Sequence, residues 1–182
     1  MNKILKGFWL LIRYGPAKIA EWQEQSIYDS LTGLYNRRFL LEVGKRELAR
    51  ADRAKKEGVQ YPISLVFIDL RKLKLINDHE GHKAGDESLK TVAVLLRKIC
   101  QRKVDVVCRI SGDEFVILLP DTTISGAERV VEKIQIASQG LSSPGGRLIV
   151  LDCGMAEAES SLNELLQKAD EAMYQNKKGS KS

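Results

Sequence analysis

The chain has 182 residues, of which 43% are hydrophobic and 29% charged, and its formal net charge is +5 at pH 7. This length suits one domain with a core and a short appendage, and the composition is ordinary for a soluble globular protein. The positive charge permits an anionic partner such as a nucleotide. No extended basic cluster indicates a polynucleotide groove, so we expect no nucleic acid as a partner.

Residues 1–27 are predicted to be a helical, apolar lead-in to a domain at 28–182. The apolar stretch at 4–12 is interrupted by a lysine and a glycine, is too short to span a bilayer and lacks a convincing signal-peptide cleavage site. Apolar residues flanked by basic ones at 1–13 suit contact with a membrane surface. Packing on a partner subunit or on the domain itself is the favoured alternative.

From residue 36 onward, helical and strand patterns follow one another along the chain. The expected elements are a helix at 36–56, a strand at 61–70, a helix at 85–100, a β-hairpin at 104–119, a helix at 126–141, a strand at 147–155 and a helix at 162–177. The central six form the split βαβ, ferredoxin-like order, which places helices on one face of an antiparallel sheet. The sequence therefore predicts an α/β (α+β) fold.

The cysteines and histidines predict neither a disulfide framework nor a zinc site. Cys100, Cys108 and Cys153 are odd in number and lie in apolar segments, as reduced core residues of a cytoplasmic protein do. His79 and His82 lack cysteine or histidine partners at the spacing of zinc ligands.

The hairpin carries the most informative residues of the chain. Two apolar runs, 106–110 and 115–119, flank a turn that holds Gly112, Asp113 and Glu114. Turn formation alone accounts for most hairpins of this kind, because glycine and acidic residues favour turns. In the ferredoxin-like strand order, however, the end of the first strand at Asp69 lies near this turn.

Carboxylates gathered at strand ends are costly unless a cation neutralises them. Oxygen-only ligands favour Mg²⁺, which binds a few carboxylates together with phosphate oxygens and stabilises a triphosphate. Lys74 and Lys177 could neutralise the remaining phosphate charge, although a solvated surface charge is the simpler interpretation of either lysine. The residues alone predict no more than a metal–nucleotide site.

Four motifs in order resemble the GGDEF family of diguanylate cyclases, over essentially all of residues 28–178. Residues 29–38 match D-x-L-T-G-L-x-N-R-R, 69–86 match D-x-D-x-F-K-x-x-N-D…G-H-x-x-G-D with changes, 111–115 match the signature turn, and 169–177 match A-D-x-A-L-Y-x-x-K. Four motifs at compatible spacings are specific, whereas the five-residue turn alone would not be. The resemblance implies a palm-type nucleotide cyclase fold, with a central antiparallel sheet flanked by helices.

The resemblance implies a homodimer that condenses two GTP into cyclic di-GMP and two pyrophosphates with Mg²⁺ (or Mn²⁺), under inhibition by its product. It assigns Asp69, the Leu70 carbonyl and Asp113 to the metal, Asp113 and Glu114 to catalysis, Asn77 and Asp86 to guanine, and Leu73, Lys74 and Lys177 to phosphates. A carboxylate at Asp86 suits guanine, because it accepts both N1–H and N2–H, a donor pair that adenine lacks. A helix-end cap is the alternative role of Asn77, and an N-cap that of Asp86.

Arg102 and Asp105 form an R-x-x-D motif five residues before the signature turn. The resemblance implies that this motif is an inhibitory site for the product. With a rise of about 3.3 Å per residue, Arg102 lies on the order of 25 Å from Asp113, so one nucleotide pocket cannot include both. A surface ion pair, worth little for stability, is the alternative.

The chain departs from the family pattern at several positions. Ser111 replaces the first glycine of the signature, Arg71 the second aspartate of the first-strand motif and Leu73 its phenylalanine, and the closing glycine-arginine is missing. Arg71 and Ser111 favour a second hypothesis, a catalytically weakened module that binds GTP or cyclic di-GMP as a sensor. The retained acids and Asn77 favour the enzyme. A different nucleotide polymerase or cyclase on the same fold is a third hypothesis.

Overall fold

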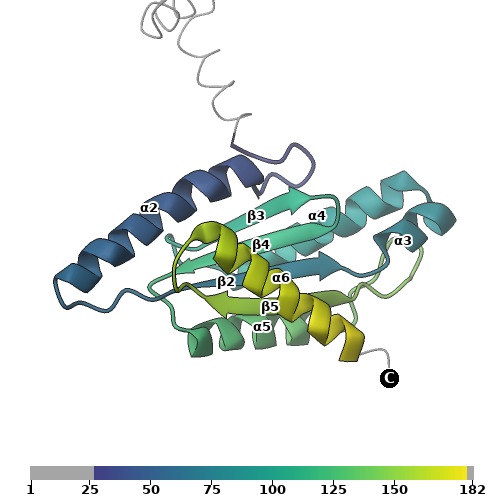
Figure 1. Ribbon diagram of the computed structural model, residues 1–182. Coiled ribbons are helices and arrows are strands. Elements are labelled where there is room, and N and C mark those ends of the chain that lie inside the picture. Colours follow the sequence, from purple (N-terminus) through teal and green to yellow (C-terminus); the bar gives the residue numbers. More distant parts are fainter. Residues whose placement is uncertain (1–26, 180–182) are drawn as a thin grey trace, which may run out of the picture.

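The computed structural model describes residues 27–179, which form a five-stranded sheet with helices on both of its faces (Figure 1). The elements are β1 (Tyr35–Asn36), α2 (Arg37–Lys56), β2 (Ile63–Leu70), α3 (Leu73–Glu80), α4 (His82–Ile99), β3 (Val106–Ser111), β4 (Glu114–Pro120), α5 (Ile124–Ser138), β5 (Leu151–Glu157) and α6 (Leu162–Gly179). The strand order is β1-β3-β4-β2-β5. β1 runs parallel to β3, and the other neighbouring strands are antiparallel.

The predicted α/β fold of ferredoxin-like order is confirmed, because β5, β2, β4 and β3 lie side by side as the split βαβ arrangement requires. Within this core, α4 and α5 pack on one face of the sheet, against residues such as Val66 and Ile117. The other face is equally apolar, with Phe67 and Val116 buried in it, and α2 and α6 cover it. The expectation of helices on one face therefore holds only for the six-element core, in which α4 and α5 share a face. The second face is also apolar, so it needs helices of its own.

Helix α6 approaches β5 closely at Gly154. A Cβ at this position would lie 2.0 Å from Met173 N and 2.3 Å from Ala169 O, so only glycine leaves room for the backbone of the helix. One turn further on, Asn176 Nδ2 donates a hydrogen bond of 3.0 Å to Cys153 O. These contacts hold the last turns of α6 against the sheet.

The structure corrects three local predictions. Helix α3 was not expected as a separate element. The helix predicted from residue 85 begins at His82. The strand predicted from residue 147 begins at Leu151, because residues 142–148 form their own turn, in which Ser143 N donates to Arg147 O at 2.8 Å.

The three cysteines are free thiols in apolar surroundings. Burial raises the pKa of each of them to about 12, so they stay protonated at neutral pH. No helix in the described range 27–179 is long and apolar enough to cross a membrane. The segment at 1–13, for which we predict contact with a membrane or a partner, lies outside the described residues.

Candidate functional site

Three carboxylates form a row across neighbouring strands at one end of the sheet. Asp69 of β2 lies opposite Glu114 of β4 on one side and opposite Asp152 of β5 on the other. Side chains alternate along a strand, so these residues share a face with Phe67 and Val116, which pack beneath α2 and α6. Like charges directly opposite each other destabilise a sheet, so this row requires cations.

Asp113 joins the row from the signature turn. Its carbonyl oxygen accepts a hydrogen bond of 2.9 Å from Leu70 N, so the backbones at Leu70 and Asp113 lie side by side. The end of the first strand therefore meets the hairpin turn, as the ferredoxin-like order predicts.

Lys177 supplies the first cation. Its Nζ lies 2.5 Å from Asp69 Oδ1 and 3.9 Å from Asp152 Oδ2. Burial lowers the pKa of the Lys177 ammonium, but the hydrogen bond to Asp69 and the charges of Asp69, Asp152 and Asp113 outweigh burial and leave the pKa above its usual value. The helix docking at Gly154 thus delivers a fixed positive charge to the row.

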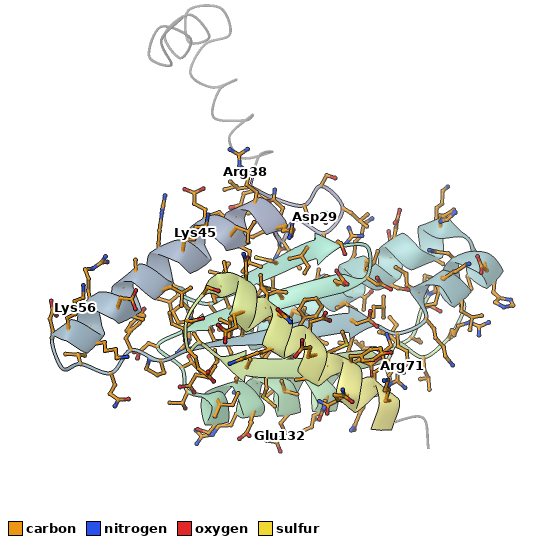
Figure 2. The ribbon with its side chains drawn as sticks, viewed as in Figure 1. Asp29, Arg38, Lys45, Lys56, Arg71 and Glu132 are labelled. Atoms are coloured by element: carbon orange, nitrogen blue, oxygen red, sulfur yellow. The ribbon has the colours of Figure 1, made fainter. Side chains whose placement is uncertain are left out.

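Arg71 supplies the second cation. Its Nε donates to Asp152 Oδ2 at 2.8 Å and a terminal nitrogen donates to Oδ1, so the ion pair is bidentate. Figure 2 shows Arg71 at the end of the sheet, beside the last turns of α6. Arg71 is one of the departures from the family pattern, whereas Asp152 was not expected at the site. The available signal was a carboxylate inside the apolar run 149–153.

Ser111 contacts Glu114 within the signature turn, with its hydroxyl donating a hydrogen bond of 2.5 Å to Glu114 Oε2. The turn is also tied to the segment that precedes α2. Arg109 donates to Gly112 O at 2.7 Å and to Asp29 Oδ1 at 3.1 Å. Asp29 lies beside β3 in Figure 2.

The two residues expected to read guanine come together at the start of α4. Asn77 of α3 lies directly over Gly85, because a Cβ on this glycine would come within 1.9 Å of Asn77 Oδ1. Asp86 follows and is exposed. It is the fifth residue of α4, whose N-cap is Gly81, so the alternative role of Asp86 as an N-cap is wrong.

Of the three residues expected to hold phosphates, only Lys177 lies at the carboxylate row. Lys177 reaches the carboxylate row, whereas Lys74 is exposed on the first turn of α3. The side chain of Leu73 is buried in the core, so only its backbone could contact a ligand.

Arg102 and Asp105 lie at the opposite end of the β3–β4 hairpin from the signature turn. Arg102 donates to Asp105 Oδ1 at 2.6 and 2.9 Å, to Pro120 O at 2.8 Å and to Thr122 Oγ1 at 2.8 Å. Asp105 is nearly buried, while about half of the Arg102 side chain is exposed. The pair is therefore built into the end of the hairpin.

The donors of the carboxylate row fit Mg²⁺. Asp69, Asp113 and the Leu70 carbonyl offer only oxygen, and they lie at adjoining strand ends. Within residues 27–179, no three acidic, histidine or cysteine side chains form a ready-made metal cage. Mg²⁺ commonly binds through one or two carboxylates plus phosphates of the substrate rather than in an all-protein cage, so this donor set is sufficient.

Residues 26–182 match the family model described as diguanylate cyclase, GGDEF domain. The response regulator PleD from Caulobacter vibrioides is 35% identical over 166 residues, covering 85% of this chain and 34% of PleD. The diguanylate cyclase DosC from Escherichia coli is 37% identical over 158 residues, covering 80% of this chain and 32% of DosC. The chain thus spans about a third of the length of these relatives.

Solved structures agree with these matches. The GGDEF domain of DgcB from Caulobacter crescentus, in complex with c-di-GMP, superposes with a TM-score of 0.74 at 26% identity, covering 84% of this chain and 91% of that one. The active GGEEF domain of a diguanylate cyclase from Vibrio cholerae gives a TM-score of 0.72 at 28% identity, covering 79% of this chain and 91% of that one.

Proposed function

The chain belongs to the GGDEF family of diguanylate cyclase domains, and on this premise we propose that it condenses two GTP into cyclic di-GMP and two pyrophosphates. One observation carries the proposal. Asp69 and Asp113, at adjoining strand ends, face a lysine from α6, with Asn77 and Asp86 together on the neighbouring helices.

Each residue has a role that follows from its chemistry. Asp69, Asp113 and the Leu70 carbonyl hold Mg²⁺ (or Mn²⁺), which neutralises triphosphate charge and polarises the α-phosphate when bound. Asp86 accepts N1–H and N2–H of guanine, and Asn77 binds the same base edge. This assignment favours GTP over ATP.

The remaining residues act on the phosphates and the attacking hydroxyl. Lys177 and Lys74, with the backbone at Leu73, neutralise and orient the triphosphate. Glu114 assists activation of the 3′-hydroxyl. In each of two transfers, a 3′-oxygen forms a bond to an α-phosphorus, the bond to pyrophosphate breaks and the hydroxyl proton is released.

The reaction requires two copies of the chain. Each pocket holds one GTP, and each 3′-hydroxyl must attack the α-phosphate of the other nucleotide, so we propose a homodimer in which the two pockets face each other. We place the reaction in the cytoplasm, where nucleoside triphosphates and reduced thiols are kept. At the far end of the hairpin, Arg102 and Asp105 form the site at which cyclic di-GMP inhibits the enzyme.

The test is incubation of the purified protein with GTP and Mg²⁺, followed by separation of the products. Cyclic di-GMP and pyrophosphate should accumulate, and Asp113→Asn should lower the rate by at least about a hundredfold, because a charged ligand of the cation is lost. Asp170→Asn, an exposed carboxylate on α6, is the matched control.

The contacts at the row also favour a second candidate, a module that binds GTP or cyclic di-GMP without turnover. Lys177 binds Asp69 and Ser111 binds Glu114, so two of the acids have partners before any ligand enters. GTP that remains unchanged over hours, with cyclic di-GMP still bound in an Arg102-dependent manner, would identify the module as a sensor.

A further inference from the structure

Asp152 has no part in the proposed reaction, yet it is buried next to the residues that carry it. It is 6% exposed and lies opposite Asp69 in the register of β5 and β2. A buried carboxylate is costly unless it is paired. The partners of Asp152 are Arg71 and Lys177, and both cations also act on Asp69.

Lys177 lies between two acceptors. Its Nζ is 2.5 Å from Asp69 Oδ1 and 3.9 Å from Asp152 Oδ2. A divalent cation that binds Asp69 competes with Lys177 for the same carboxylate. The displaced ammonium then needs another acceptor, and Asp152 is a second carboxylate within 4 Å. Because an ammonium can rotate its three donors, this shift requires little movement of α6.

Arg71 follows Asp69 by two residues and could pair with it. Instead, the guanidinium points to β5, where two of its nitrogens donate hydrogen bonds to the two oxygens of Asp152. Without Asp152, Asp69 is a nearby counter-charge for Arg71, and the guanidinium would compete with any cation for that carboxylate.

The charges at this end of the sheet also match one divalent cation. Four carboxylates meet two cationic side chains, which leaves a surplus of two negative charges. The groups are Asp69, Asp113, Glu114 and Asp152, with Arg71 and Lys177. Loss of Asp152 would reduce this surplus to one, although Arg71 would remain.

We propose that Asp152 is a positioning residue of the divalent-cation site, which keeps Arg71 away from Asp69 and accepts Lys177 when a cation binds Asp69. The inference rests on the proposed function for the role of Asp69 as a metal ligand. It concerns cation binding alone and can be tested without turnover.

The test measures binding of Mn²⁺ to the full chain without nucleotide, from the electron paramagnetic resonance signal of free Mn²⁺. Asp152→Asn should bind Mn²⁺ at least about tenfold more weakly, because it removes a nearby negative charge, frees Arg71 and leaves Lys177 on Asp69. Glu157→Gln is the matched control, since it removes the same charge at the far end of β5, and should leave Mn²⁺ affinity unchanged.

Two further variants separate positioning from a general loss of structure. Arg71→Gln with Asp152→Asn replaces the ion pair by neutral amides and should bind Mn²⁺ about threefold or more tightly than Asp152→Asn alone. Arg71→Gln alone keeps Asp152 available to Lys177 and should bind Mn²⁺ more tightly than the wild type. Thermal unfolding of each variant establishes that it is folded.

Three results would overturn the inference: no saturable Mn²⁺ binding by the wild type, wild-type affinity in folded Asp152→Asn, or no gain from Arg71→Gln in either background. A separate assay of cyclic di-GMP synthesis from GTP distinguishes failure of this inference from failure of the proposed function. Mn²⁺ affinity that depends on Asp152 in a protein that makes no cyclic di-GMP would refute the enzyme alone. Cyclic di-GMP synthesis with Mn²⁺ affinity indifferent to Asp152 would refute the inference alone.

Discussion

Ser111 donates its hydroxyl to Glu114 Oε2 at 2.5 Å, at a position where the family signature has glycine. A hydrogen bond to a charged group typically contributes about 1.5–3 kcal/mol to the free energy of folding. Here the bond occupies one oxygen of the carboxylate that we propose assists the 3′-hydroxyl. The serine therefore competes with the reacting groups for Glu114.

Ser111→Gly and Ser111→Ala should each raise the initial rate of cyclic di-GMP synthesis, by up to about tenfold, because both free Glu114 from the hydroxyl. Ser111→Thr keeps a hydroxyl at this position and should remain close to the wild type. The measurement is the initial rate at saturating GTP and Mg²⁺. Rates at or below the wild type for both Gly and Ala would show that the hydrogen bond does not restrain Glu114.

At the scale of the elements, the close packing of α6 on β5 leaves no room for a side chain at Gly154. The backbone of the helix contacts β5 where Gly154 has no side chain, and its last turns carry Lys177 to Asp69. Packing and charge placement therefore depend on the same glycine.

Gly154→Ala should lower the free energy of unfolding by about 1–3 kcal/mol, because its Cβ would overlap the backbone of Met173 and Ala169. It should also lower the rate of cyclic di-GMP synthesis with GTP and Mg²⁺, since a displaced helix withdraws Lys177 from the triphosphate. Chemical denaturation gives the first effect. Gly112→Ala is the stability control, because nothing lies within 4 Å of a Cβ at that glycine. Equal stability of the two variants would contradict the close packing.

The segment before α2 is joined to the hairpin by a partly buried ion pair between Asp29 and Arg109. Burial raises the pKa of Asp29, but hydrogen bonds from Thr32 and Arg109 and the charge of Arg109 outweigh it and leave the pKa below its usual value of 3.8. Such a carboxylate stabilises the fold above its unfolded pKa, and the contribution is lost as the pH falls through the folded pKa.

Asp29→Asn should therefore lower the melting temperature at about pH 7, and its difference from the wild type should shrink below about pH 4. Thermal unfolding across this pH range measures both effects. Asp78→Asn, an exposed carboxylate on α3, serves as the control and should follow the wild type throughout. A difference for Asp29→Asn that stays constant down to pH 3 would exclude ionisation of Asp29 as its cause.

The longer elements could be predicted from the sequence because each carries a sustained apolar period, as α2 and α4 do. Helix α3 was missed since it has only eight residues and lies inside a motif. The start of β5 was placed early because an apolar run already begins at Leu148, although Leu148 and Ile149 pair with residues 141–142. Asp152 stood out in the sequence only as a carboxylate inside an apolar run, and its place opposite Asp69 depends on register, which no local pattern specifies.

At the scale of the whole molecule, one hairpin connects two sites. The signature turn lies at one end of β3 and β4, and Arg102 hydrogen-bonds Pro120 O at the other. The proposed substrate and inhibitor pockets are thereby held apart by the pairing of β3 with β4, whose register shifts once, between Arg109 and Ser111.

Arg102→Ala should raise the concentration of cyclic di-GMP that gives half-maximal inhibition by at least about tenfold, because the guanidinium that would bind guanine and phosphate is lost. Lys103→Ala, a change at the neighbouring exposed residue, is the control and should keep wild-type inhibition. The measurement is a titration of the initial rate with added cyclic di-GMP. Unchanged inhibition in Arg102→Ala would remove the regulatory role of this pair.

The docking of α6 on Gly154 also has a consequence for the order in which the protein is completed. A ribosome makes residues 162–179 after every strand of the sheet, so until then the apolar face around Phe67 and Val116 has only α2 to cover it. At that stage the carboxylate row lacks the ammonium of Lys177. Arrival of the last helix therefore closes the core and sets the charge of the site in a single event, so a chain shortened before Leu162 would lose both together.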